Sequence, residues 1–259
     1  MQNARNPQAL RALRKKFIKK AIVRLLAMAL VVCALLIART VYDNSRAAAA
    51  AVAQQEKPTL AEALGDGSSS DSGGRKVDFG TLRKQNVHVV AWLHIPKTQI
   101  DYPVAQATDN DYYLSHTARL EPSRYGSLFL DCRNHEDFSD FNNIVYGHNM
   151  RDGKMFGSLK QFGSEEFFNE VKTGTLQTPT RNYRLEFFAV LVTDPKSDVY
   201  NIAFAAPAMQ DGHLAMLQQR HLYWRDIDIG YSDRILTLST CANNLKDRVV
   251  VVAKIVPLP

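Results

Sequence analysis

The residues best suited to chemistry lie at the ends of two apolar runs near the C-terminus. The run over residues 235–241 ends in Cys241, and the next run starts at Arg248. A cysteine attacks as its thiolate, which a neighbouring cation or base stabilises. We therefore interpret Cys241 as a candidate nucleophile with Arg248 beside it. The plainer alternative is an inert core thiol, with Asp247 as the ionic partner of Arg248.

His148 is the candidate proton carrier. It directly follows an apolar run over residues 143–146, and Gly147 permits a sharp exit from that strand. An imidazole at the end of a sheet could exchange protons with a thiol and with a leaving amine. The alternative is a solvated loop histidine. Weaker candidates, in more ordinary strand or loop contexts, are His94, His116 and His135.

Three further side chains are secondary candidates for contact with a substrate: Ser239, Thr240 and Tyr146. Ser239 stands two residues before Cys241, so on a strand it points to the same face and could hydrogen-bond a substrate or the thiolate. Thr240 belongs to the same run. Tyr146 stands two residues before His148 and could line a groove. The alternatives are satisfied strand hydroxyls and a core aromatic side chain.

Two motifs resemble the signature of sortases, the membrane-anchored cysteine transpeptidases of Gram-positive bacteria. Thr-Leu-Ser-Thr-Cys at 237–241, with Arg248 on the next strand, is similar to their cysteine motif. Asn-Ile-Val-Tyr-Gly-His-Asn-Met at 143–150, with Asp-Gly-Lys-Met-Phe at 152–156, is similar to the histidine segment of class B sortases. The connection over 194–230 also resembles the class B insertion before the cysteine strand. The resemblance spans residues 78–256, and the two motifs in this order are highly specific.

The resemblance implies acyl transfer in two steps. Cys241 would cleave a C-terminal sorting motif of exported proteins at a threonine carbonyl, while Arg248 holds the oxyanion and His148 protonates the departing amine. A peptidoglycan or pilin amine would then resolve the thioester, and no cofactor is needed. The implied partners are surface proteins that carry the sorting motif, and the peptidoglycan amine. The alternatives are an exported cysteine protease with the same three residues and a non-catalytic surface binding domain.

Short strands must position these residues. Strands are expected at 89–95, 100–104, 127–131, 143–146, 174–177, 183–192, 235–241 and from 248 onward. Helices are expected at 78–86 with Asp78 as N-cap, at 164–171 after a serine cap, and at 208–224. The pattern indicates a mainly β, closed or nearly closed barrel. With the resemblance, we expect an eight-stranded sortase-like β-barrel with an N-terminal helix and a helix inserted before the cysteine strand.

The chain is expected to have four parts. Residues 1–20 form a basic cytoplasmic tail, 21–40 a transmembrane anchor, 41–75 a flexible extracytoplasmic linker, and 76–259 the sortase catalytic domain. The positive-inside rule places the N-terminus in the cytoplasm. The expected localisation is therefore the cell membrane, single-pass, with the catalytic domain outside. A cleaved signal peptide is the alternative, because Ala-Val-Ala at 51–53 resembles a cleavage site.

Composition argues against several other classes of protein. The formal net charge of +6 comes from the basic N-terminus, so no nucleic-acid partner is indicated. The cysteines Cys33, Cys132 and Cys241 are too few for a disulfide framework or a zinc site, with a Cys132–Cys241 disulfide as a lesser alternative. The short acidic stretch 109–111 does not support a calcium site. No metal is expected.

Overall fold

The computed structural model describes residues 33, 34, 36, 37, 39, 40, 77–241 and 247–259. None of the helices in these ranges has the length and apolar character needed to cross a bilayer. The predicted single-pass membrane localisation, with the catalytic domain outside, is corrected on this finding. A spanning helix needs about 20 residues, more than any helix in the described ranges provides. The tail over 1–20 and the linker over 41–75 lie outside the described residues, and the four domain boundaries stay predictions.

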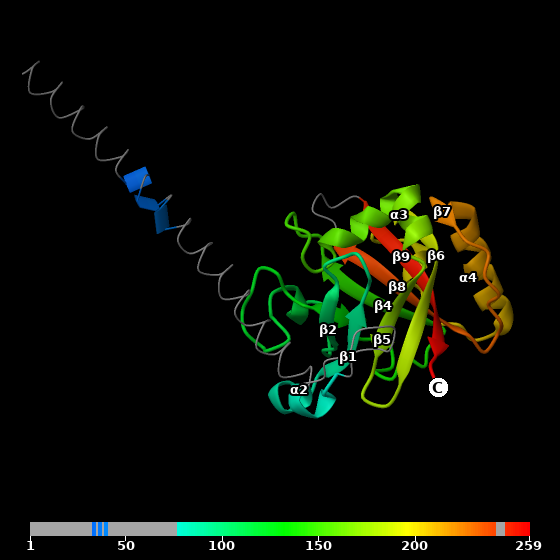
Figure 1. Ribbon diagram of the computed structural model, residues 1–259, viewed down its shortest axis with the longest axis horizontal. Helices are drawn as coiled ribbons and strands as arrows, with labels where there is room; N and C mark the ends of the chain where they lie inside the picture. The colour runs from blue at the N-terminus through cyan, green and yellow to red at the C-terminus, as the bar shows by residue number, and fades with distance from the viewer. Residues whose placement is uncertain (1–32, 35, 38, 41–76, 242–246) are drawn as a thin grey trace, which may run out of the picture. The chain divides into compact units, whose positions relative to one another are not determined.

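Among the described residues, eight strands close into a barrel (Figure 1). In order around the ring these are β5 (Thr173–Gln177), β1 (Val89–His94), β2 (Asp101–Ala105), β3 (Leu128–Leu130), β4 (Asn142–His148), β8 (Arg234–Cys241), β9 (Arg248–Pro257) and β6 (Asn182–Thr193). Pairing of β5 with β6 completes the ring. A further short strand, β7 (Tyr223–Trp224), pairs with β6 outside it. The predicted mainly β, closed eight-stranded barrel is confirmed.

Two of the predicted helices begin at the predicted caps. The N-terminal helix α2 (Phe79–Gln85) follows Asp78, whose carboxylate accepts the Thr81 N–H at 3.1 Å. Helix α3 (Glu165–Glu170) follows Ser164, whose side chain accepts the Phe167 N–H. Side-chain oxygens satisfy free N–H groups of the first turn, which is why these residue types start helices. Short 3₁₀ segments are η1 (Tyr112–Leu114), η2 (Gly157–Gly163) and η3 (Asp198–Tyr200).

The inserted helix α4 (Pro207–Arg220) lies before the cysteine strand, as predicted, but it is shorter than the expected 208–224. It ends early because Tyr223 and Trp224 pair with Val190 and Ala189 of β6. The sequence there has helical spacing, yet a strand partner is available, and tertiary pairing overrides local preference.

The strands β8 and β9 are buried on both faces. Ile235 of β8 and Val252 of β9 pack in one cluster with Tyr200 of η3 and Leu217 of α4. The next residue, Leu236, is equally buried but points to the other face. Burial on two sides favours continuous apolar runs over an alternating pattern. The insertion before β8 therefore explains why both strands place apolar residues on two faces, while the hydroxyls of β8 are buried and hydrogen-bonded.

Candidate active site

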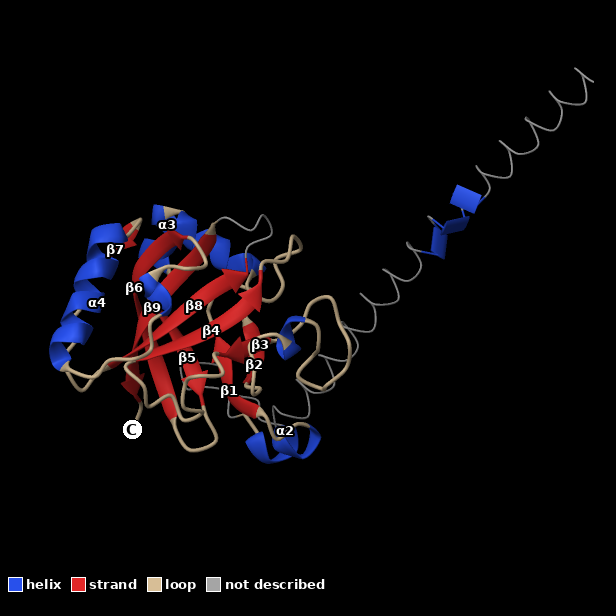
Figure 2. Ribbon diagram, turned by 180° about the vertical axis from the view of Figure 1, so that it is seen from behind, coloured by secondary structure: helices blue, strands red, loops and turns tan. Residues whose placement is uncertain are grey.

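Strands β4 and β8 are neighbours, run in the same direction and end together (Figure 2). Their register pairs Tyr146 with Ser239 and His148 with Cys241. Paired strands lie about 4.8 Å apart, so the last residues of two strands far apart in sequence become neighbours. The sequence predicts that His148 and Cys241 each stand at a sheet end. The fold adds that it is the same end of adjacent strands.

Arg248 begins β9, which runs antiparallel to β8. The register pairs Ser239 with Val250, and the Thr240 side chain bonds the backbone of Val249. Arg248 directly precedes Val249, so it lies beside the end of β8 at which Cys241 stands. On its other side it pairs with Thr193 of β6. The backbone thus brings positions 148, 241 and 248 to one end of three consecutive strands.

The Arg248 side chain is half-buried and its guanidinium lies over the Tyr200 ring, 5.8 Å from Cζ to the ring centroid. Its Nε is buried and finds no hydrogen-bond partner among the described residues. The alternative of an ion pair with Asp247 is not borne out, since neither residue has an ionic partner in the described part of the chain. A half-buried guanidinium without a carboxylate is costly. The Nε of Arg248, without a partner among the described residues, can donate to a carbonyl or oxyanion.

The His148 ring is half-buried and anchored by a backbone group. Its Nε2 lies 2.7 Å from the carbonyl oxygen of Leu114, at the end of η1. A carbonyl only accepts, so Nε2 carries the proton and donates. In the neutral ring Nδ1 is then the nitrogen that can take a proton. The β2–β3 connection therefore fixes both the tautomer and the orientation of the imidazole.

The secondary candidates lie deeper in the wall. The Ser239 hydroxyl is fully buried and lies 3.0 Å from the Tyr200 hydroxyl. Thr240 is 1% exposed and bonds the backbone of Val249. Tyr146 is 9% exposed and donates to Asp131 at 3.0 Å. The hydroxyls of all three are thus engaged with protein groups, and substrate contact by these side chains stays a prediction.

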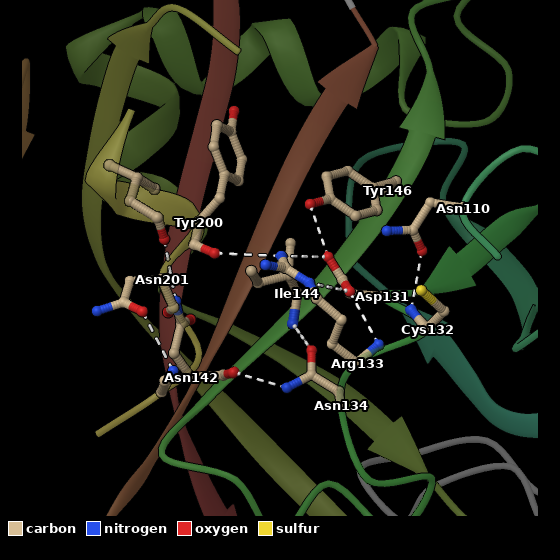
Figure 3. Close-up of polar contacts among 12 residues, drawn as sticks. Asn110, Asp131, Cys132, Arg133, Asn134, Asn142, Ile144, Tyr146, Tyr200 and Asn201 are labelled. Atoms are coloured by element: carbon tan, nitrogen blue, oxygen red, sulfur yellow. Dashed lines mark hydrogen bonds and ion pairs between the residues drawn. The ribbon is translucent and has the colours of Figure 1, made fainter. Parts of the chain in front are cut away.

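Tyr146 belongs to a buried network around Asp131 (Figure 3). The Asp131 carboxylate also accepts from the Arg133 guanidinium at 2.8 Å, and Arg133 donates in turn to the Tyr200 carbonyl at 3.3 Å. Burial raises the pKa of Asp131, but the hydrogen bonds from Arg133 outweigh it, so the pKa is lowered. Burial and the Asp131 charge raise the pKa of Tyr146. The network connects η3, whose Tyr200 ring lies against the Arg248 guanidinium, to strands β3 and β4.

At their opposite, starting end, β4 and β8 are held by buried amides (Figure 3). The Asn142 side chain accepts from the Thr237 hydroxyl at 2.6 Å and donates to the carbonyls of Val199 and Asn201 at 3.0 and 2.9 Å. Asn134 donates to the Asn142 carbonyl and accepts the Ile144 N–H. We call Asn134, Asn142 and Thr237 the anchored end. They fix the start of the strands whose other ends carry His148 and Cys241.

Sequence reasoning missed Leu114 and Tyr200. Leu114 contributes a backbone carbonyl, which no pattern of side chains reveals. Tyr200 lies in the long connection before β8 and reaches Arg248 only by tertiary packing. The one usable signal was an aromatic residue inside the insertion, and that is too common to single out a position.

The other candidates are engaged elsewhere. His135 bonds Asp140 at 2.8 Å, which raises its pKa. His116 stacks on Tyr112 with 4.2 Å between ring centroids, and His94 lies 3.7 Å from Asp101. Cys132 is a free thiol, so the alternative disulfide with Cys241 does not form. Over the described ranges, no cluster of His, Cys, Asp or Glu is arranged to hold a metal ion.

Comparison with known proteins decides the family. The sortase domain family matches residues 93–256. The chain belongs to the sortase family. This sortase is 40% identical over 180 residues to sortase B of Listeria monocytogenes, covering 68% of this chain and 72% of that protein.

Solved structures agree with this assignment. Sortase B from Bacillus anthracis in complex with AAEK1 matches with a TM-score of 0.70 and 34% identity over 80% of this chain and 98% of that one. The Staphylococcus aureus sortase B–substrate complex matches with a TM-score of 0.67 and 30% identity, over 70% and 85% of the two chains. The class B resemblance is therefore confirmed, and this sortase is a cysteine transpeptidase.

Proposed function

We propose that this sortase cleaves a C-terminal sorting motif of a surface protein through a thioester on Cys241 and transfers the acyl group to a peptidoglycan or pilin amine. His148 is the general acid and base, and Arg248 stabilises the oxyanion. The observation that carries the proposal is the register of β4 and β8, which pairs position 148 with position 241 at the strand ends. Support also comes from Arg248, whose Nε has no partner among the described residues.

In the first step Nδ1 of His148 takes the proton of the Cys241 thiol, and the thiolate attacks the threonine carbonyl of the motif. A carbon–sulfur bond forms, and the electron pair of the carbonyl moves onto its oxygen. The forked donors of Arg248 hold this oxyanion, which is where preformed donors lower a barrier most. The carbon–nitrogen bond then breaks as Nδ1 of His148 gives that proton to the leaving amine. The product is a thioester, which keeps the acyl group activated.

In the second step an acceptor amine replaces the leaving peptide. Nδ1 of the neutral His148 ring takes a proton from this amine, which attacks the thioester carbonyl. The carbon–sulfur bond breaks and the thiolate returns. A sorting-motif donor and an amine acceptor are supported by relatives: sortase B of Staphylococcus aureus has been solved with a substrate, and a sortase B has been solved with triglycine.

Mixing the full chain with the substrate peptide of the Staphylococcus aureus complex, with and without triglycine, tests the proposal. Mass spectrometry should find a ligated product only when triglycine is present. Hydroxylamine should capture the acyl group in its place. The Cys241→Ala variant should give neither product, and His148→Ala should lose most of the turnover.

The outcomes separate the alternative functions. If the peptide is only hydrolysed, and no ligated product forms when triglycine is present, this chain is a protease of this peptide and the transfer proposal is wrong. Ligation that survives in Cys241→Ala would remove the thioester from the mechanism.

A further inference from the structure

Gly147, directly before His148, sits where no side chain fits. It is buried in β4, and a Cβ built on it would lie 2.4 Å from Leu128 Cδ2 and 2.8 Å from the Phe156 ring. Both neighbours are fully buried and cannot move into solvent. Because successive residues of a strand point to opposite faces, the Phe156 ring packs on the face of β4 opposite to the His148 side chain.

Phe156 is brought back to the strand by the segment 149–156, which we call the return loop. Asn149 and Met155 form an antiparallel bridge across it, and the Phe156 N–H donates to the His148 carbonyl at 2.9 Å. Its turn needs the left-handed backbone of Gly153, with φ of +84°. Met155, 4% exposed, also takes a positive φ of +50°. A non-glycine residue in that region carries strain, which surrounding contacts must offset.

We propose that Gly147 and Phe156 are positioning residues that hold His148 opposite Cys241 on the neighbouring strand. The inference rests on the proposed role of His148. His148 is fixed from two sides. The Leu114 carbonyl holds its ring Nε2, and the Phe156 N–H holds its backbone carbonyl. The Phe156 ring against the bare Cα of Gly147 sets how closely the return loop approaches the strand.

A methyl group at position 147 would break this arrangement. Ordinary carbon–carbon contacts lie about 3.5–4.0 Å apart, so the strand end or the return loop must move by about 1 Å. The backbone of His148 moves with either one, because it is bonded to both. A displacement of about 1 Å at a catalytic group lowers turnover by about 100-fold.

The test compares Gly147→Ala with Gly163→Ala, an exposed glycine where a Cβ would meet nothing within 4 Å. Ligation of the Staphylococcus aureus substrate peptide to triglycine should lose about 100-fold in kcat in Gly147→Ala, with little change in KM. Gly163→Ala should match the wild type. The double variant Gly147→Ala/Leu128→Ala removes the side chain closest to the new methyl group and should recover at least about tenfold of the loss.

A substrate-free readout separates positioning from folding. The pH profile of Cys241 modification by the thiol reagent MTSET should shift in Gly147→Ala toward the profile of His148→Ala, at an unchanged far-UV circular dichroism spectrum. If Gly147→Ala does not fold, Phe156→Leu alone decides, with an expected loss of about tenfold in kcat.

The two proposals fail in different ways. Wild-type kcat in Gly147→Ala, or in Phe156→Leu where that variant decides, overturns the positioning role if His148→Ala is inactive. Full activity of His148→Ala overturns the proposed function itself. A loss of activity in Gly147→Ala with the MTSET profile unmoved and no rescue by Leu128→Ala would also reject the positioning role.

Discussion

The two ends of the β4–β8 pair differ in how completely their polar side chains are hydrogen-bonded. At the anchored end, the buried side chains of Asn134, Asn142 and Thr237 bond one another and the backbone. One acceptor nearby, Asn143 Oδ1, has no partner among the described residues. At the other end, which we call the site end, Arg248 lies half-buried with its charge unpaired by any described carboxylate, and His148 has one nitrogen committed.

This difference separates stability from chemistry. A fully bonded buried amide fixes strand alignment and has no capacity left for a ligand. A donor held in place without a partner lowers stability, but it is ready for an oxyanion that forms only during reaction. Since the same two strands serve both purposes, the anchored end can hold the register on which the site end depends. Changes at the site end should therefore alter turnover, and changes at the anchored end should alter the free energy of unfolding.

The largest expected effect is that of Arg248→Lys on turnover. The charge is kept, but the planar fork that can hold an oxyanion is lost, so kcat for peptide ligation should fall by about 100- to 1,000-fold. The melting temperature should stay within a few degrees of wild type. Arg184→Lys, an exposed arginine of β6, is the matched control and should be silent. Turnover of Arg248→Lys close to wild type would contradict the oxyanion role.

Next comes Asn142→Ala, which should lower the free energy of unfolding by about 3 kcal/mol. The substitution leaves the Thr237 hydroxyl and the carbonyls of Val199 and Asn201 without their buried partner. Urea unfolding measures the loss, with the exposed Asn169→Ala as control. The kcat per folded molecule should fall far less than in Arg248→Lys. Equal stability of the two asparagine variants would remove the distinction between the ends.

Acid should lower the free energy of unfolding through a buried histidine of α4. His213 of α4 is 5% exposed and packs edge-on against Phe141 and Phe204. Burial lowers its pKa from 6.5 to about 4, with the Asp198 charge opposing the shift. The unfolded chain therefore takes up the proton first, and stability falls as the pH drops from about 6.5 toward about 4.

The expected loss is about 2 kcal/mol between about pH 7 and about pH 5. In His213→Phe, the free energy of unfolding measured with urea should change little across that pH window. In His135→Gln the pH dependence of the unfolding free energy should persist, because His135 has a raised pKa and contributes to that dependence with the opposite sign. An unchanged slope in His213→Phe would show that other groups carry the pH dependence.

The smallest effect is expected for Thr237→Val, about 1 kcal/mol of unfolding free energy. The isosteric change keeps the packing and removes only the hydroxyl that donates to Asn142. Calorimetry of the variant and of the double variant with Asn142→Ala should show that the two losses do not add. Additive losses would mean that the 2.6 Å bond contributes nothing.

The sequence alone determined the strands, the caps at Asp78 and Ser164, and which cysteine, histidine and arginine to consider. These follow from local rules: apolar runs, side-chain oxygens before a helix, and polar residues directly after a strand. It misjudged the end of α4, because Tyr223 and Trp224 take a strand partner that the local pattern does not reveal.

Only the tertiary structure decided that positions 148, 241 and 248 share one end of the barrel wall. Register between strands far apart in sequence depends on burial of both faces and on contacts such as Asn142 with Thr237, and a slip of one residue would turn every side chain to the other face. The carbonyl of Leu114 and the ring of Phe156 act on His148 through space, so no spacing in the sequence announces them.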